Sequence, residues 1–249
     1  MGRSRKRNQQ EELSWGDGWD VAPCRASTRP AASVQLPVEQ PILPPGAVAD
    51  PPTAAAEVSI LREDNVSATM LTADPLLSTA ECAAWIAWAE GAGFELQKHA
   101  QTAHIAHRDN GRLAIESADV AAALFERLRP LAPAQLPGGK RPVGCNPNIR
   151  LYKYEPGQRF GRHVDQAVRL ADGSETEFTL LVYLNDEGLE GGETMFYEGH
   201  GARAPTAARI APRAGTCLLH AHGERCLTHE GAAVTRGVKY LLRSDLAYG

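Results

Sequence analysis

The sequence predicts an α+β fold that is mainly β, in which two helices brace a β core behind a disordered tail. Three observations predict it: a proline-rich N-terminal stretch, two helical patterns in the middle of the chain, and a series of short apolar runs near its end. A length of 249 residues allows one large domain plus a tail. We expect a tail or linker at 1–65 and a domain at 66–249, with helical support at 66–147 and a β-barrel core at 148–249.

Composition excludes several classes of protein. The chain has 26 basic and 30 acidic side chains and a net charge of −4, which excludes a polycation that binds nucleic acid wholesale. Its apolar runs fall far short of the ~18 residues that a bilayer span needs, so no membrane partner is expected. The five cysteines are odd in number and include no Cys-x-x-Cys, which indicates neither a disulfide framework nor a four-cysteine zinc site. A reducing compartment is therefore expected.

The N-terminal region predicts location and disorder. Residues 1–8 are basic and no apolar signal follows, so we expect no secretory signal and a cytoplasmic protein, although the basic cluster leaves the nucleus open. Eight of the seventeen prolines lie between Pro23 and Pro52, mixed with alanine, serine and valine. Proline at this density favours extended, unpaired backbone, which predicts the disordered tail.

Regular structure is expected from about Val66, beginning with two helices. Ser78 and Glu81 form a capping box at the start of the first. Its apolar stripe consists of Cys82, Trp85, Ile86 and Ala89, and Gly91 and Gly93 end it. The second helix starts at Ser117 and ends before Pro130. Its apolar stripe consists of Val120, Leu124 and Leu128.

From residue 148 the pattern changes to strands. Short apolar runs are bounded by glycine, proline, asparagine or aspartate, which is typical of a β sandwich or barrel. The expected strands are Ile149–Tyr154, Phe178–Leu184, Thr194–Tyr197, Ala207–Ala211, Thr216–His220 and Val238–Leu246. Gly191-Gly192 predicts a hairpin turn with positive φ angles.

Two histidines and one aspartate have the spacing of a metal site. His163 and Asp165 are two residues apart, so on a strand they point to the same face, and we expect them to end the strand that begins near Ile149. His229, just before the last strand, is the best third ligand. Two imidazoles and one carboxylate leave three positions of an octahedron open, as in the facial triad of non-haem Fe(II) oxygenases.

A cation on the last strand suggests a second binding group. Lys239 lies ten residues after His229 and can point into the same barrel, where an ammonium is costly unless an anion meets it. A dicarboxylate that chelates the metal at one end would supply that anion. Arg243 lies four residues further along the strand, so its side chain is expected on the same face, and it competes for this role.

The segment Asn148–Asp165 resembles the motif that enters the catalytic barrel of prolyl 4-hydroxylase-type 2-oxoglutarate/Fe(II) dioxygenases. Later segments match in order: Phe178–Asn185, Gly191–Thr194, His229–Gly231 and Lys239-Tyr240. The resemblance covers roughly residues 66–249. It implies a double-stranded β-helix, or jelly-roll, core.

The resemblance also implies an activity. His163, Asp165 and His229 would hold Fe(II), and Lys239 would pair with the distal carboxylate of the cosubstrate 2-oxoglutarate, with Tyr154 and Tyr183 as further contacts and ascorbate as the reductant that rescues the iron. The reaction hydroxylates an unactivated C–H bond and releases succinate and CO₂. By analogy the substrate is a proline-containing protein or peptide.

Alternatives stay open. The same chemistry on a small molecule or free amino acid is one, and a metal-binding barrel without turnover is another. His220-Ala221-His222, with Glu224 nearby, is a weaker metal candidate of the cupin type. His107-Arg108-Asp109-Asn110 is expected to form a turn, with Arg112 a candidate for the substrate cleft and Thr179 a weaker candidate for the site.

Overall fold

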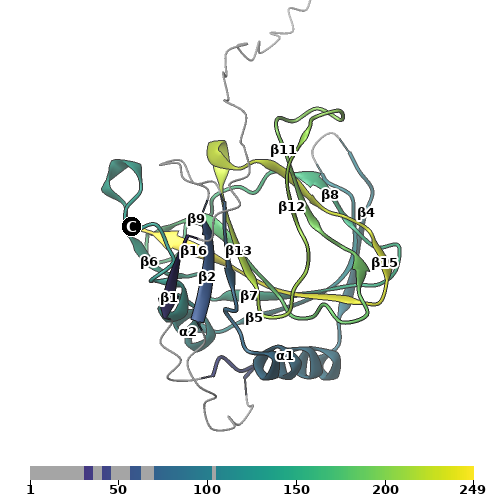
Figure 1. Ribbon diagram of the computed structural model, residues 1–249, viewed down its shortest axis with the longest axis horizontal. Helices are drawn as coiled ribbons and strands as arrows, with labels where there is room; N and C mark the ends of the chain where they lie inside the picture. The colour runs from purple at the N-terminus through teal and green to yellow at the C-terminus, as the bar shows by residue number, and fades with distance from the viewer. Residues whose placement is uncertain (1–30, 36–40, 46–56, 63–69, 103–104) are drawn as a thin grey trace, which may run out of the picture.

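The computed structural model describes residues 31–35, 41–45, 57–62, 70–102 and 105–249 (Figure 1). It contains two α-helices, α1 (Thr79–Ala92) and α2 (Ala118–Leu128), and two 3₁₀ turns, at Pro137–Gly139 and Gly223–Arg225. The strands before residue 150 are β1 (Ala31–Gln35), β2 (Glu57–Arg62), β3 (Met70–Asp74), β4 (Glu95–His99), β5 (Arg108–Glu116), β6 (Pro142–Cys145) and β7 (Asn148–Tyr154). The later strands are β8 (Phe160–His163), β9 (Glu175–Tyr183), β10 (Glu190–Gly191), β11 (Thr194–Tyr197), β12 (Thr206–Ile210), β13 (Cys217–Ala221), β14 (Thr228–Gly231), β15 (Val234–Arg236) and β16 (Lys239–Tyr248).

The strands form one antiparallel sheet that curls into a barrel (Figure 1). Its order is β1-β2-β3-β13-β9-β16-β7-β5-β8-β14-β11-β12, with β4 paired to β5 and β6 to β16, while β10 and β15 pair separately. Sequence neighbours are therefore often not sheet neighbours: β9 lies between β13 and β16. The fold class expected from the sequence, a mainly β jelly-roll core with two bracing helices, is confirmed.

Side-chain alternation along the central strands separates two cores. In β9, Leu180 and Val182 pack in the larger core with the helices, whereas Leu181 and Tyr183 belong to a second cluster inside the barrel. Since successive residues of a strand point to opposite faces, the same alternation places every second residue of β7, β13 and β16 in the barrel interior. The interior face is where a ligand site can form.

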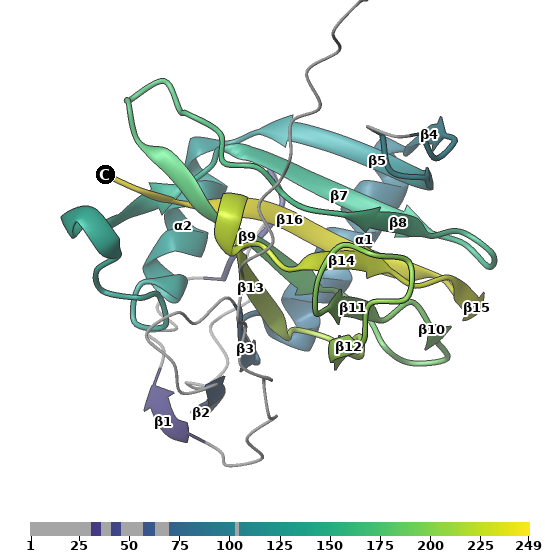
Figure 2. The ribbon, with the colours of Figure 1, turned by 90° about the horizontal axis from the view of Figure 1, so that it is seen from above.

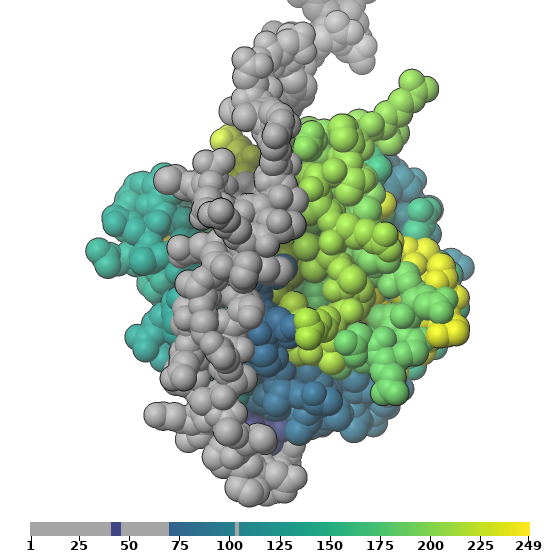
Figure 3. Space-filling view, viewed as in Figure 1, coloured from purple at the N-terminus to yellow at the C-terminus, as the bar shows by residue number. Residues whose placement is uncertain are grey.

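The two helices brace the outside of the sheet (Figure 2). Both begin as expected: Ser78 and Glu81 form a reciprocal capping box, and the Ser117 side chain caps α2. A buried ion pair joins the helices, because Arg127 of α2 donates to Glu81 of α1 at 2.6 and 3.0 Å. In the space-filling view, the green surface around β11 and β12 lies next to the blue surface of the α1 region (Figure 3).

Part of the segment expected to be a tail is described. It contributes the paired strands β1 and β2, and β2 also pairs with β3. Ile42 is buried in the main core, and its carbonyl accepts a 2.9 Å hydrogen bond from the Trp85 indole N–H. At residues 41–45 the expected disorder does not hold, because Ile42 packs in the core and bonds to Trp85 of α1. The expected disorder of 1–30, 36–40, 46–56 and 63–65, and the predicted start of regular structure at Val66, lie outside the described residues.

Other expectations about elements need correction. The segment predicted as a turn at His107–Asn110 runs into strand β5, which pairs along its length with β7. The strand that begins near Ile149 ends at Tyr154, so His163 and Asp165 do not end it, and a separate strand, β8, ends at His163 instead. Neither described helix combines the length and the apolar character needed to cross a bilayer.

Candidate active site

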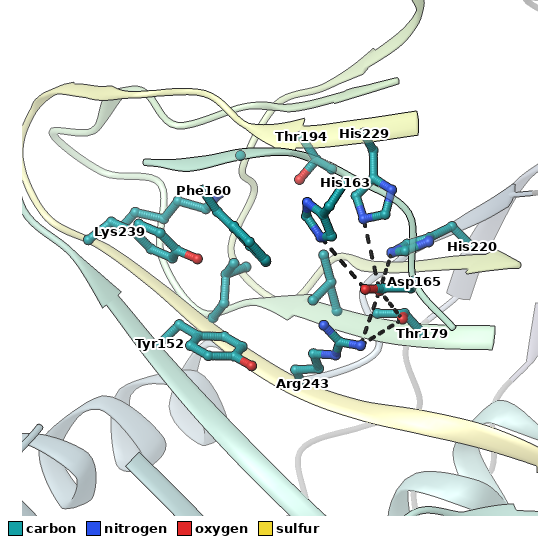
Figure 4. A pocket seen from close by; sticks show the side chains of 14 residues that line it. Tyr152, Phe160, His163, Asp165, Thr179, Thr194, His220, His229, Lys239 and Arg243 are labelled. Atoms are coloured by element: carbon teal, nitrogen blue, oxygen red, sulfur yellow. Dashed lines mark hydrogen bonds and ion pairs between the residues drawn. The ribbon is translucent and has the colours of Figure 1, made fainter. Parts of the chain in front are cut away.

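Three predicted ligands meet at the ends of neighbouring strands. His163 ends β8 and lies directly opposite His229 of β14 in the antiparallel ladder, with ring centroids 4.2 Å apart. Asp165 follows β8. Its Oδ1 lies 3.6 Å from His163 Nε2, and its Oδ2 lies 3.9 Å from His229 Nε2. One nitrogen or oxygen atom from each of the three lies within 4.8 Å of the other two. The structure thus brings together the three side chains expected from sequence (Figure 4).

Backbone carbonyls fix the orientation of both imidazoles. His163 Nδ1 is 2.8 Å from the Gly161 carbonyl oxygen, and His229 Nδ1 is 3.0 Å from that of Leu227. A carbonyl only accepts, so each Nδ1 carries the hydrogen and donates it. The Nε2 lone pairs are left free toward Asp165, which is the tautomer and the outer hydrogen bond typical of metal-ligating histidines.

The carboxylate is held ionised and oriented. Asp165 Oδ2 accepts a 2.6 Å hydrogen bond from the Thr179 hydroxyl and forms a 3.1 Å ion pair with Arg243. Burial alone would raise the pKa of Asp165, but the Arg243 guanidinium beside it holds this pKa well below its usual range. The backbone N–H of Asp165 donates to Cys226 Sγ at 3.2 Å. Asp165 therefore offers a charged oxygen to the cluster.

Burial keeps the imidazoles neutral. It is the main reason why the pKa of His163 falls to about 3, and it also lowers the pKa of His229. Neutral imidazole is the form that binds a metal, so no proton has to be removed before a cation enters at neutral pH. Two imidazole nitrogens and one carboxylate oxygen are a donor set that suits Fe(II). His163, Asp165 and His229 therefore fit an Fe(II) ion.

Lys239 lies at the opposite end of the same pocket (Figure 4). Its side chain is 2% exposed, and its Nζ donates to the Gly192 carbonyl oxygen at 2.5 Å. Among the described residues no carboxylate lies within ion-pair distance, 4.0 Å, of this nitrogen. Burial lowers the pKa of Lys239 to about 7. An anion that enters the pocket would therefore meet a buried cation that forms no ion pair with any described carboxylate.

Arg243, the competing cation, already has its partners. Its guanidinium lies 3.1 Å from Asp165 and 3.3 Å from Asp245, and it donates to the Thr179 hydroxyl. Although burial opposes the charge, these two carboxylates raise the pKa of Arg243 above its ordinary value. Arg243 is thus placed to orient a predicted metal ligand, and Lys239 is the cation available to a ligand's distal carboxylate.

The two predicted tyrosines lie around Lys239. The Lys239 Nζ is 5.3 Å from the ring centre of Tyr154 and 5.6 Å from that of Tyr183. The Tyr183 hydroxyl is 2.6 Å from the Thr194 hydroxyl, and burial raises the pKa of both tyrosines. Tyr154 lines the pocket directly, while Tyr183 lies behind Thr194, which lines it.

An aromatic residue that was not expected from the sequence lines the pocket, with a cation packed on it. Phe160 stacks on the His163 ring with centroids 3.8 Å apart, and the Arg108 guanidinium lies 4.1 Å from the centre of the Phe160 ring. Their apolar and planar groups shield one side of the cluster. Because β8 and β5 were not predicted as strands, the orientation of these two side chains could not be predicted.

Some of the weaker candidates from the sequence lie in the site and others do not. Thr179 does lie in the site, through its bond to Asp165. Arg112 does not line the pocket, and Glu224 is exposed on the turn after β13. His220 lines the pocket, whereas His222 contacts the hydroxyls of Thr176 and Thr179 instead, so the two do not form a cupin-type pair with Glu224.

Comparison with known proteins agrees with this geometry. The sequence model described as the 2OG-Fe(II) oxygenase superfamily matches residues 149–244, which includes all three members of the cluster and both candidate cations. The match confirms the resemblance indicated by the motifs. No curated protein sequence matches the chain.

Three solved structures are similar to this chain, one of them with a TM-score above 0.5. A prolyl hydroxylase from Trichoplax adhaerens, solved with a peptide fragment of the hypoxia inducible factor oxygen degradation domain, is similar with a TM-score of 0.51 and 16% identity, over 72% of this chain and 83% of the other. A viral collagen prolyl hydroxylase from Paramecium Bursaria Chlorella virus-1, solved with 2OG, has a TM-score of 0.49 and 19% identity over 72% and 96% of the two chains. A Pseudomonas putida prolyl-4-hydroxylase has a TM-score of 0.48 and 18% identity over 72% and 91%.

Proposed function

We propose, on the premise that residues 149–244 are a 2OG-Fe(II) oxygenase domain, that this chain hydroxylates an unactivated C–H bond of a protein side chain, with proline the first candidate. Bound Fe(II), with 2-oxoglutarate and dioxygen, supplies the oxidising chemistry and releases succinate and CO₂. His163, Asp165 and His229 hold the metal. Lys239 binds the distal carboxylate of the cosubstrate.

One observation carries the proposal: the pocket has a neutral-imidazole and carboxylate cluster at one end and an unpaired buried ammonium at the other. A dicarboxylate with a 2-oxo group has matching chemistry, because its keto acid end chelates a metal while its other end needs a cation. The protein's own part is to orient Asp165 through Thr179 and Arg243, and to keep water from the cluster with Phe160 and Arg108.

The substrate and setting are the finer part of the proposal. A peptide substrate is supported by the Trichoplax relative, which was solved with a peptide. Ascorbate serves as the reductant that restores Fe(II), and the protein acts in the cytoplasm or nucleus. A free amino acid or small molecule is the alternative substrate.

Succinate production tests the chemistry. The purified protein, supplied with Fe(II), 2-oxoglutarate and ascorbate, is expected to release succinate, and His163→Ala and Asp165→Ala should abolish this release. Because both residues are at strand ends, the variants are expected to keep the circular dichroism of the parent. A matched control is His107→Ala, which removes a half-buried histidine outside the pocket. Succinate release by the His163→Ala, Asp165→Ala double variant would contradict the assignment.

Peptide capture tests the substrate. Proline-containing peptides incubated with the protein are analysed by mass spectrometry for a gain of one oxygen atom, with the Asp165→Ala variant as the blank. Oxygen gain on proline supports the prolyl assignment. Succinate release that free amino acids stimulate, with no peptide modified, would favour the alternative.

A further inference from the structure

A buried carboxylate with no role expected from the sequence is bound to Arg243. Asp245 lies on β16, two residues after Arg243, and is 2% exposed. Since alternate residues of a strand share a face, Asp245 lies on the same face of the sheet as Arg243, which lines the pocket. In the antiparallel ladder Asp245 is directly opposite Thr179 of β9, the residue whose hydroxyl donates to Asp165. Asp245 therefore belongs to the polar network behind the metal cluster, although it does not line the pocket itself.

Asp245 holds one edge of the Arg243 guanidinium. Both Nε and Nη2 of Arg243 donate to Asp245 Oδ1, each at 3.3 Å. The same Nη2 lies 3.1 Å from Asp165 Oδ2 and donates to the Thr179 hydroxyl at 3.2 Å. A guanidinium is a rigid planar fork, so a carboxylate that holds one edge also fixes where its donors meet other groups. Asp245 thus determines how Arg243 contacts Asp165.

Asp245 also separates two arginines. Arg150 of β7 is directly opposite Arg243 in the ladder, and like charges in such positions on neighbouring strands repel. Arg150 forms its ion pair with Oδ2 of Asp245, whereas Arg243 is bound to Oδ1. The side-chain amide of Asn146 donates to Oδ2 at 3.1 Å. One carboxylate therefore balances both cations and keeps Arg243 at Asp165.

We propose that Asp245 is a positioning residue of the metal centre, which acts through Arg243 and fixes the oxygen with which Asp165 binds the metal. The inference rests on the metal site of the proposed function and adds no ligand to its three. Thr179 and Arg243 both contact Oδ2 of Asp165, and two such donors occupy the two acceptor sites of this oxygen.

The other carboxylate oxygen of Asp165 is left for the metal. No described residue donates a hydrogen bond to Oδ1, which lies 3.6 Å from His163 Nε2. Asp165 therefore binds through Oδ1 alone. With the two imidazoles of His163 and His229, this gives three protein ligands and keeps three positions of an octahedron open for a chelating 2-oxo acid and dioxygen.

Metal binding by Asp245→Asn tests the inference, because this replacement removes the charge and keeps the shape. Arg150 and Arg243 then face each other without a carboxylate between them, so Arg243 is no longer held at Asp165. Calorimetric titration should show a Co²⁺ affinity roughly 10- to 100-fold lower, as when an outer group that orients a metal ligand is lost. The visible absorption of bound Co²⁺, which reports the arrangement of its ligands, should change as well. At saturating metal the 2-oxoglutarate concentration that the reaction requires should stay as in the parent, because Lys239 lies at the far end of the pocket (Figure 4).

A double-mutant cycle shows whether Asp245 acts through Arg243. Arg243→Met alone should also weaken Co²⁺ binding, since it removes the contact with Asp165. If Asp245 acts through Arg243, adding Asp245→Asn to Arg243→Met should lower the Co²⁺ affinity by no more than about twofold, which is the usual error of such cycles. Two independent contributions would multiply instead.

Glu81→Gln is the matched control for a general loss of stability. It makes the same kind of change in another buried ion pair between a carboxylate and a guanidinium, that with Arg127, outside the pocket. Its Tm should fall while its Co²⁺ affinity and absorption stay as in the parent. Thermal unfolding of the metal-free proteins identifies any variant that does not fold. Asp245→Ser, which leaves room for water, replaces Asp245→Asn if the asparagine variant fails to fold.

The outcomes separate this inference from the proposed function. Unchanged Co²⁺ binding in the folded Asp245 variant, effects that multiply in the cycle, or an equal loss of affinity in Glu81→Gln would overturn the positioning role, while the three-ligand site stands. The expected Co²⁺ results in a protein that releases no succinate would support the positioning role and contradict the oxygenase activity. Failure of the parent to bind Co²⁺ would overturn both.

Discussion

Replacement of Lys239 by methionine isolates the role of the buried ammonium. Methionine keeps much of the unbranched stem and removes the charge, so the packing against Tyr154 and Tyr183 changes little. The variant should bind Fe(II) as before, because Lys239 lies at the far end of the pocket from Asp165 (Figure 4). It should bind 2-oxoglutarate much more weakly.

The size of the effect follows from the surroundings of Lys239. Its Nζ is buried and has a carbonyl oxygen within bonding distance, but no carboxylate from the part of the chain that the structure describes. A hydrogen bond between charged groups contributes roughly 1.5–3 kcal/mol. At about 1.4 kcal/mol per factor of ten, its loss corresponds to roughly a 10- to 150-fold higher requirement for 2-oxoglutarate.

Succinate release is measured as the 2-oxoglutarate concentration is varied and, separately, as the Fe(II) concentration is varied. In Lys239→Met only the concentration of 2-oxoglutarate that the reaction requires should rise. Lys153→Met is the matched control, because Lys153 is a strand lysine that pairs with Glu90 outside the pocket. An unchanged 2-oxoglutarate requirement in Lys239→Met would refute the reasoning and transfer the role to Arg243.

Three further predictions concern pH, the carboxylate and the helical support. The pKa of Lys239 is about 7 without a bound anion, so above that pH most of its side chain is neutral. A dianion that binds the ammonium form must then be accompanied by protonation of Lys239, which weakens binding. Calorimetry should therefore show 2-oxoglutarate affinity falling by up to about tenfold per pH unit above neutrality, and a pH-independent affinity in that range would disprove this. Thr179→Val removes the 2.6 Å hydrogen bond to Asp165 and should weaken Co²⁺ binding by roughly 10- to 100-fold, with unaltered affinity as the contrary result. Glu81→Ala removes the buried carboxylate that accepts from Arg127 and should lower the free energy of unfolding by about 3–5 kcal/mol in denaturant titrations. Burial alone would raise the pKa of Glu81, but Arg127 and backbone N–H donors lower it. The stability that this pair contributes is therefore present above the unfolded-state pKa of Glu81 and is lost as the pH falls through its folded-state pKa. A loss of unfolding free energy below about 1 kcal/mol, or one confined to alkaline pH, would argue against the pair's role.

The strands that could be predicted from sequence are those that contain an apolar run bounded by turn residues. β7, β9, β11, β12, β13 and β16 all appear within three residues of their expected bounds. β8, with the sequence Phe-Gly-Arg-His, has no such run, and β5 begins with three polar residues. Both are held by pairing with partners far along the chain, and that pairing leaves no local signal.

The convergence of the site could be predicted only in part. Spacing places His163 and Asp165 on one side, and order along the chain suggests His229. Alternation along the strand cannot show which of Lys239 and Arg243 binds the anion, since both side chains face the interior of the barrel. Only the pairing of Arg243 with Asp165 and Asp245 distinguishes them, and Asp245 had no expected role.

The contact between Ile42 and Trp85 sets a limit on how far the chain can be shortened. Composition suggests that everything before residue 66 is expendable, yet Ile42 is buried, and its backbone N–H donates to Glu81 while its carbonyl accepts from the Trp85 indole. A truncation at residue 66 would uncover the largest aromatic ring of the core and invite self-association. A crystallisation or screening fragment should therefore start upstream of Pro41.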